Sequence, residues 1–140
     1  MSFIVQPASA SSFVGVLGVT QGGTGLTSAG TVGNVLTSTG TIWASSASAA
    51  WQTKTTTYTA VSGDYLLVDT SGGAFTITLP ITPAANATVY FQDAKGTFST
   101  NNLTVARNGQ TIMGLSENLT ASTDDYGFGL IYNGSDWRIF

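Results

Sequence analysis

Hydrophobic and polar residues alternate through the second part of the chain, from Trp51 to Phe140. In the run AFTITL, apolar Phe75, Ile77 and Leu79 fall on one side of an extended backbone and the threonines fall on the other. Alternation of this kind predicts β-strands. We expect nine of them, over residues 58–61, 65–69, 75–79, 89–92, 103–107, 111–113, 118–121, 128–132 and 137–140.

Turn signals separate these stretches. The pairs Asn108-Gly109 and Asn133-Gly134 predict two-residue hairpin turns of type I′, because both central residues of such a turn have positive φ. Gly72-Gly73 is a third predicted turn. Strands that recur about every eight to twelve residues with such turns predict an all-β domain, a short antiparallel β-sandwich or a jelly-roll-like barrel.

The apolar positions of the alternating stretches make up the predicted core of this domain. Its members are Leu66, Val68, Phe75, Ile77, Leu79, Val89, Phe91, Leu103, Val105, Leu130 and Ile139.

The first part of the chain has a different pattern. Its residues are mostly Gly, Ser, Thr, Ala and small apolar types, and the first charged side chain is Lys54. Disordered segments combine low hydrophobicity with high charge, whereas here apolar residues recur throughout. We therefore expect this part to complete its core with other chains. The predicted organisation is an extended anchoring arm over 1–19, a Gly/Ser/Thr-rich stalk over 20–50 and a β-domain over 51–140.

Composition and charge argue against several classes of function. Charged residues make up 8% of the chain, and the formal net charge is −3. Four scattered Lys and Arg residues argue against a nucleic-acid partner and against a membrane-surface helix. The N-terminus lacks the basic region of a secretory signal, and the best apolar stretch is too short to span a bilayer. With no Cys and no His, the chain lacks the usual nucleophile–base pairs, and we expect no enzyme and no cofactor.

Two kinds of motif in the chain resemble proteins of tailed bacteriophages. The run QGGTGLTSAGTVGNVLTSTGTIW, over 21–43, resembles Gly-Gly-Thr-Gly … Gly-Asn-Val-Leu-Thr-Ser … Trp segments of tail-fibre and other virion-surface proteins. The segments YTAVSGDYLLVDTSGGAFTITLP, NNLTVARNGQTIMGL and LIYNGSDWRI are similar to a small β-domain of phage structural proteins. The resemblance covers about four-fifths of the chain, as the sum of these runs and their spacers.

The resemblance implies a homotrimer whose Gly-rich segments intertwine and whose N-terminal arm docks on the particle. A single Gly-Asn-Val-Leu motif favours a short element close to the virion surface over a long fibre. The expected function is that of a non-enzymatic virion structural protein, a capsid-decoration protein or short head fibre, assembled in the host cytoplasm. The alternatives are a short tail or collar fibre that contacts the host receptor, or a glycan-binding β-module.

This interpretation assigns roles to two sets of residues. The trimer interface is predicted to contain Val35, Leu36, Ile42, Trp43 and Trp51. The virion anchor is predicted to contain Phe3, Ile4, Val5, Phe13 and Val14, with the major capsid protein or a tail or neck protein as partner.

A further candidate is a host-glycan site near the last predicted hairpin. It would combine Tyr126 and Trp137 with Asn133 and Asp136, because aromatic rings stack on sugar C–H groups while amides and carboxylates bind hydroxyls. The alternative is that these rings belong to the core.

Two other motifs have simpler interpretations. Asp124-Asp125 suits a solvated turn, with a Ca²⁺ ligand pair or half of a glycosidase pair as alternatives. The Gly22-Gly23-Thr24-Gly25 run lacks the Lys-Ser/Thr of a phosphate-binding loop. No metal site is expected.

Overall fold

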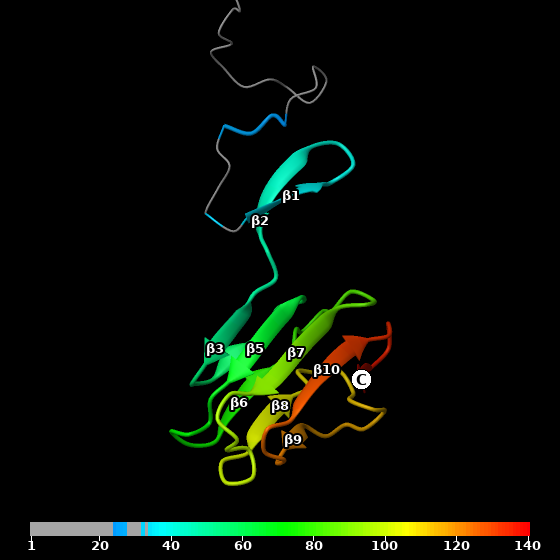
Figure 1. Ribbon diagram of the computed structural model, residues 1–140. Coiled ribbons are helices and arrows are strands. Elements are labelled where there is room, and N and C mark those ends of the chain that lie inside the picture. The colour runs from blue at the N-terminus through cyan, green and yellow to red at the C-terminus, as the bar shows by residue number, and fades with distance from the viewer. Residues whose placement is uncertain (1–23, 28–31, 33) are drawn as a thin grey trace, which may run out of the picture. The chain divides into compact units, whose positions relative to one another are not determined.

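The computed structural model describes residues 24–27, 32 and 34–140, so the predicted virion anchor lies outside the described residues (Figure 1). The described part of the chain is all-β and contains no helix. The chain divides into two units, Met1–Ser48 and Ala49–Phe140. We refer to them as unit 1 and unit 2 and describe each by itself.

The described part of unit 1 contains a β-hairpin. Strand β1 (Asn34–Ser38) pairs antiparallel with β2 (Trp43–Ala47), with Asn34 opposite Ala47 and Ser38 opposite Trp43. The connecting turn is closed by the Thr39 amide, which donates to the Ile42 carbonyl at 2.9 Å, and Gly40 provides the positive φ of 91° that this turn requires. The sequence predicted a Gly/Ser/Thr-rich stalk or intertwined segment here and no hairpin, because the two strands are too short to show a clear alternation.

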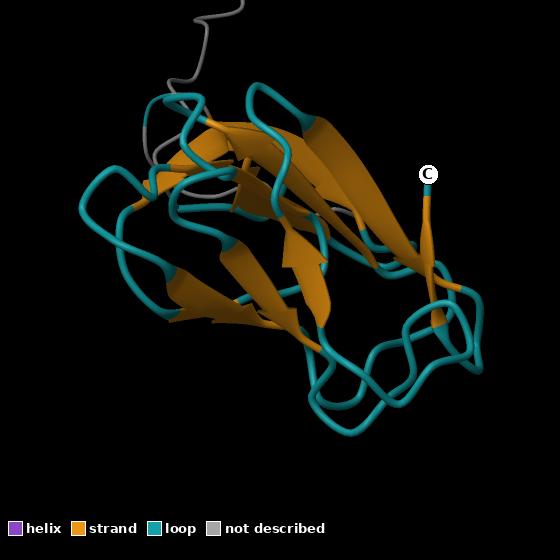
Figure 2. Ribbon diagram, turned by 90° about the horizontal axis from the view of Figure 1, so that it is seen from below, coloured by secondary structure: helices purple, strands orange, loops and turns teal. Residues whose placement is uncertain are grey.

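Unit 2 contains two sheets. The first has five strands in the order β11-β10-β7-β5-β3 and the second has four in the order β4-β6-β8-β9. The strands are β3 (Trp51–Lys54), β4 (Tyr58–Thr59), β5 (Asp64–Val68), β6 (Phe75–Thr78), β7 (Thr88–Asp93), β8 (Leu103–Ala106), β9 (Leu119–Ala121), β10 (Gly127–Tyr132) and β11 (Trp137–Ile139). They form two layers joined by loops (Figure 2).

From β3 to β8 the chain alternates between the sheets, so neighbours within a sheet run in the same direction. The pairs β3–β5, β5–β7, β4–β6 and β6–β8 are all parallel. Only the pairs that involve β9, β10 and β11 are antiparallel in unit 2. The prediction of an all-β fold is thus confirmed, and the prediction of antiparallel sheets is wrong for these four pairs. Alternation along a strand shows which residues are buried, but it does not identify the neighbouring strand.

The two sheets share one hydrophobic core. Alternate residues of the central strands point into it, as in β5, where Leu66 and Val68 are buried, and in β7, where Val89 and Phe91 are buried. Nine predicted core residues are buried as expected: Leu66, Val68, Ile77, Leu79, Val89, Phe91, Leu103, Val105 and Leu130. Phe75 is partly buried and packs against the core, while Ile139 is 39% exposed.

Other large side chains complete the core, among them Trp137, for which the sequence offered a core position as the alternative to a glycan site. Trp137 and Phe98 are fully buried, and Phe128, Tyr132 and Ile112 are nearly so. Ile112 belongs to the predicted strand 111–113, which instead forms isolated bridges to Leu115 and Trp137. Loop residues such as Phe98 escape detection because their burial depends on where the loops cross the core, whereas Phe128 and Tyr132 share a strand face with Leu130 on β10.

The predicted turns form, but not all with the predicted geometry. Asn108 and Gly109 both have positive φ, 49° and 89°, and the Gln110 amide donates to the Arg107 carbonyl. This turn does not join two paired strands, however, because β8 pairs with β9 only after a longer loop. At Asn133-Gly134 a hairpin does form, but Tyr132 lies opposite Trp137, so four residues connect the strands instead of two. The third turn closes with the Gly73 amide on the Thr70 carbonyl.

Candidate functional site

The hairpin of unit 1 carries four of the five residues predicted to contact other chains. Val35 and Leu36 lie on β1 and are 46% and 47% exposed, while Ile42 and Trp43 are 56% and 41% exposed. Successive residues of a strand point to opposite faces of a hairpin. Because Val35 and Leu36 are adjacent and equally exposed, the described residues cover neither face of this hairpin.

The fifth predicted interface residue, Trp51, lies in unit 2 on the edge strand β3. Strand register places it beside Tyr65 of β5, which is beside Tyr90 of β7, which is beside Gly129 of β10. Gly129 in turn exchanges two backbone hydrogen bonds with Phe140, at 3.0 and 3.1 Å. The four aromatic residues Trp51, Tyr65, Tyr90 and Phe140 therefore form one row across the outward face of the five-stranded sheet, which we call the aromatic row.

Each ring of the aromatic row contacts the next. Trp51 meets Tyr65 edge to face at 5.4 Å between centroids, Tyr65 and Tyr90 stack at 4.3 Å, and Tyr90 meets Phe140 edge to face at 5.6 Å. The neighbouring Tyr90 phenol, followed by partial burial, raises the pKa of Tyr65. The end rings are the most open, since Trp51 is 53% and Phe140 is 59% exposed.

Two glycines of β10 shape the same face. A side chain at Gly129 would place its Cβ 2.5 Å from the Phe140 ring, so Phe140 lies over the space that the glycine leaves. Gln92 lies over Gly127 in the same way. A shallow groove results, lined in part by Trp51, Tyr90 and Phe140 above these glycines. Phe140 thereby shields the backbone of a strand glycine. An aromatic ring over a glycine of a neighbouring strand also helps to fix the register of a sheet.

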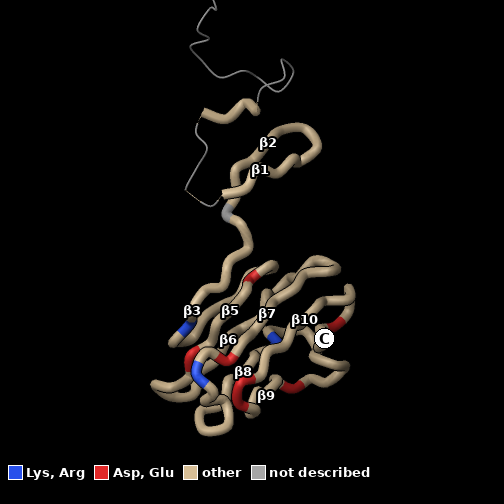
Figure 3. Tube along the Cα trace, viewed as in Figure 1, with Lys and Arg blue, Asp and Glu red and all other residues tan. Residues whose placement is uncertain are grey.

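The outward face around the row is almost free of charge. Its other positions on β3, β5 and β7 are Thr53, Leu67, Thr88 and Gln92, none of which is charged. Arg138 stands at the margin, on β11, and its Nε is paired with the Asp136 carboxylate at 3.1 Å. The charged side chains of the described chain begin at Lys54 and are spread through unit 2 (Figure 3).

Sequence reasoning did not detect the aromatic row. Tyr65 and Tyr90 occupy outward positions of their strands, where a soluble sheet normally carries polar residues, and this was the available signal. Their contact depends on the register of two parallel strands that are separated by a third strand in the sequence.

The four residues of the predicted glycan site do not form one surface. Tyr126 precedes β10 and Asn133 follows it, so they lie at opposite ends of this strand. The Trp137 side chain is fully buried in the core and cannot reach a ligand at the surface. The stacking platform that the sequence suggested is therefore not assembled.

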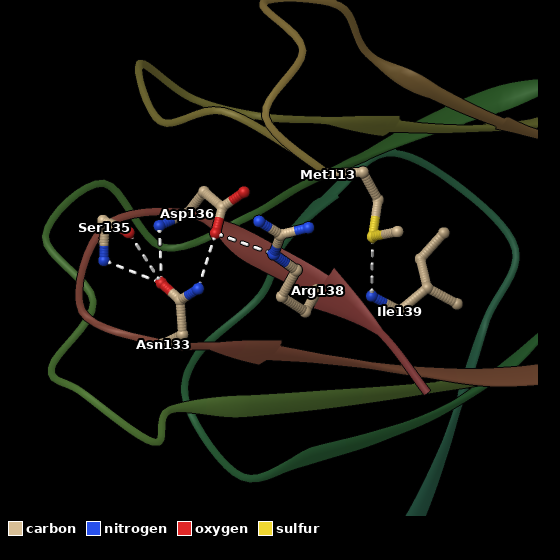
Figure 4. Close-up of polar contacts among 6 residues, drawn as sticks. All are labelled: Met113, Asn133, Ser135, Asp136, Arg138 and Ile139. Atoms are coloured by element: carbon tan, nitrogen blue, oxygen red, sulfur yellow. Dashed lines mark hydrogen bonds and ion pairs between the residues drawn. The ribbon is translucent and has the colours of Figure 1, made fainter.

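Asn133 and Asp136 instead hold the last hairpin together (Figure 4). The Asn133 amide nitrogen donates to the Asp136 carboxylate at 2.8 Å, and its carbonyl oxygen accepts from the amides of Ser135 and Asp136. Beside them the Ile139 amide donates to the Met113 sulfur at 3.5 Å, which links β11 to the loop before β9.

A buried carboxylate organises the loop that follows β7. Asp93 is 5% exposed and accepts five backbone N–H groups, from Lys95, Gly96, Thr97, Phe98 and Asp125. This set of donors satisfies the charge of the carboxylate without any cation. Asp93 is thus a structural residue that ties the loop to the turn before β10.

Asp124 and Asp125 have different roles in the turn before β10. Both oxygens of Asp124 accept from Ser99, from its amide and from its hydroxyl, each at 2.6 Å. These hydrogen bonds lower the pKa of Asp124. Asp125 has a positive φ of 56°, as expected of a turn residue. Among the described residues, no group of three or more His, Cys, Asp or Glu side chains is arranged to hold a metal ion.

The core is open at the edge between β9 and β11. A cavity of about 220 Å³ lies there, lined by Leu119, Ala121, Tyr126, Phe128 and Ile139 among others. This opening explains why Ile139 is partly exposed although it shares a strand face with the buried Trp137.

No protein-family model matches the chain, and no curated protein is similar enough to it to serve as a relative. None of the described residues belongs to a helix long and apolar enough to cross a membrane.

Proposed function

We propose that this protein is a non-enzymatic structural protein of a tailed-bacteriophage virion. It acts as a homotrimeric capsid-decoration protein or short head fibre at the particle surface. Unit 1 joins the three chains, the N-terminal arm docks on another virion protein such as the major capsid protein, and unit 2 forms a sandwich-like domain.

The observation that carries the proposal is the exposure of the unit 1 hairpin. An isolated two-stranded hairpin is at best marginally stable in water. This one also leaves Val35, Leu36, Ile42 and Trp43 at least 41% exposed. Full burial of each such side chain would contribute about 1.5–3 kcal/mol, so association with further copies gives these residues the core that one chain lacks.

The sequence motifs supply the class of assembly. The Gly-Gly-Thr-Gly … Gly-Asn-Val-Leu-Thr-Ser … Trp run over 21–43 ends on the hairpin, where Asn34, Val35 and Leu36 start β1 and Trp43 starts β2. The resemblance of this run to virion-surface proteins of tailed phages supports a trimer in which these segments intertwine.

The mass of the protein in solution tests the proposal. We expect the full chain to be a trimer by light scattering at micromolar concentration, and a chain that begins at Ala49 to be a monomer. The shorter chain keeps both sheets and the whole core of unit 2. A full chain that remains monomeric would refute the proposed assembly.

A short tail or collar fibre is the alternative within the same class. It is separated from a decoration protein by copy number, since hundreds of copies per particle exclude a tail fibre. Quantitative mass spectrometry of purified virions, with the major capsid protein as the internal standard, measures this number.

A further inference from the structure

We infer that the outward face of the five-stranded sheet is a second contact surface between copies of this chain, centred on the aromatic row. The inference rests on the proposed assembly and adds to it a surface in unit 2, separate from the hairpin of unit 1. Its core is Trp51, Tyr65, Tyr90 and Phe140, with Gln92 and the two glycines of β10 beside them.

The composition of this face is that of an interface core. Interface cores are depleted of charge and enriched in Tyr, Trp and Phe, and such residues provide most of the binding energy. Here four aromatic residues occur in one row, and the nearest charge on the face, Arg138, is already paired with Asp136. A solvated sheet face would instead carry mostly polar side chains.

The orientation of the central rings favours a protein over a sugar. Sugars bind to the open face of an aromatic ring. The Tyr65 and Tyr90 rings are stacked with their planes 8° apart, so each covers a face of the other and turns its edge outward. Edges and phenol hydroxyls suit the interdigitated side chains of a protein partner.

Charge indicates that the partner is a second copy. The chain has a formal net charge of −3, so contact between copies is least opposed on a surface without acidic side chains. The face around the aromatic row is such a surface, and it lies on the same polypeptide as the hairpin that we propose joins the copies.

The size of the face explains why this contact depends on unit 1. Five strands about 4.8 Å apart, over two rows of side chains, present roughly 200 Å², whereas a stable interface needs about 800 Å² per partner. Chains already joined through unit 1 hold their sheets at an effective concentration of the order of millimolar, at which a small face is occupied. Unit 2 by itself should therefore remain monomeric with this face open.

Single cysteines test the inference, because the chain has no Cys of its own. Gln92→Cys puts a thiol on the face, and Thr53→Cys is a second variant on the same face. Thr104→Cys is the matched control. Gln92 and Thr104 are both half-buried outward residues of interior strands, but Thr104 lies on β8 of the other sheet.

The rate of maleimide labelling is measured in the full chain and in the chain that begins at Ala49. The mass of each chain in solution is measured in parallel. We expect Gln92→Cys and Thr53→Cys to react about ten-fold more slowly in the assembled full chain than in the shorter one, because a covered thiol reacts only when the contact opens. Thr104→Cys should react equally in both.

The outcomes separate the two ideas. A full chain that assembles while both face variants react equally in the two chains overturns this inference and leaves the proposed trimer intact. The face is then free in the assembly for another occupant, such as a glycan or a virion protein. A full chain that is monomeric overturns the proposed assembly and this inference with it.

Discussion

The phenol rings of Tyr65 and Tyr90 stack with their centroids 4.3 Å apart and their planes 8° apart, on strands β5 and β7 that run parallel. Between these strands in the sequence, the chain crosses to the other sheet, forms β6 and returns. The stack therefore forms only in this parallel register. Anything that shifts this register by one residue would turn one of the two rings into the core.

The stack should be measurable as a coupling free energy. We expect Tyr65→Leu and Tyr90→Leu to be non-additive, with a coupling of about 0.5–1.5 kcal/mol in a double-mutant cycle. Urea unfolding of the chain that begins at Ala49 measures it without contributions from assembly. The pair Tyr65 and Tyr126, which are not in ring contact with each other, is the control. A coupling no larger than that of the control pair would contradict the stack.

Replacing the buried carboxylate of Asp93 should be among the most damaging changes in unit 2. Asp93→Ala leaves five backbone N–H groups without their acceptor, and we expect a loss of roughly 3 kcal/mol or more in the free energy of unfolding.

The matched control for Asp93 is Asp69→Ala. The Asp69 carboxylate accepts from the amide and hydroxyl of Ser71 at the surface, so its loss should destabilise unit 2 far less than the loss of Asp93. Equal costs for the two variants would show that Asp93 does not organise the loop after β7.

The effect of Gly129→Ala on stability should depend on the Phe140 ring. A Cβ at Gly129 would meet the Phe140 ring at 2.5 Å, so Gly129→Ala must displace this ring from the row. We expect a destabilisation of about 1 kcal/mol in the presence of Phe140. Combined with Phe140→Ala, the same change should be neutral or stabilising, because Ala is better than Gly within a strand. Equal effects of Gly129→Ala in both backgrounds would mean that the ring does not lie over the glycine.

The hydrogen bonds to Asp124 predict a pH dependence. Its pKa in the folded state is lowered from the ordinary 3.8 by Ser99. A lowered folded pKa gives stability that is present above the unfolded pKa and is lost as the pH falls through the folded value. We therefore expect this contribution to decline only below about pH 4, and Ser99→Ala to return the pKa of Asp124 towards 3.8. NMR titration of the side-chain carboxyl carbon measures the shift, and an unchanged pKa in Ser99→Ala would refute its cause.

The apolar residues of the hairpin should control assembly. Leu36→Ser and Trp43→Ser are expected to weaken the trimer by at least about ten-fold in concentration, because each removes an exposed apolar group of about 1.5–3 kcal/mol on burial. Thr37→Ser, between them in the hairpin, is the control. Sedimentation equilibrium of the full chain gives the association constant, and equal constants in all three variants would exclude this surface.

The sequence predicted most of the strands and most of the core because both depend on local alternation. Leu66, Val68, Val89 and Phe91 could be placed on the buried face without knowing their partners. The parallel course of the sheets could not be predicted in this way, since alternation is the same in a parallel and an antiparallel strand. The short strand β3 was missed because its sequence, Trp-Gln-Thr-Lys, contains a single apolar residue.

The sequence could predict those parts of the candidate site that do not depend on how the strands pair. Val35, Leu36, Ile42, Trp43 and Trp51 were selected as apolar residues in a charge-free segment, and each is exposed. The aromatic row, in contrast, required the registers of several pairs of strands. Tertiary pairing of this kind is not encoded in any short window of the chain.

The strand order of unit 2 has a consequence for how the domain forms during synthesis. In the first sheet the order β3, β5, β7, β10, β11 and in the second the order β4, β6, β8, β9 follow the chain without exception. Each new strand is therefore added at the growing edge, and none has to insert between two strands that are already paired. Long-range pairing is normally slow, because a loop must close before the contact forms. Here each strand can pair with the edge strand of its sheet soon after it leaves the ribosome, so the domain can form in the order of synthesis.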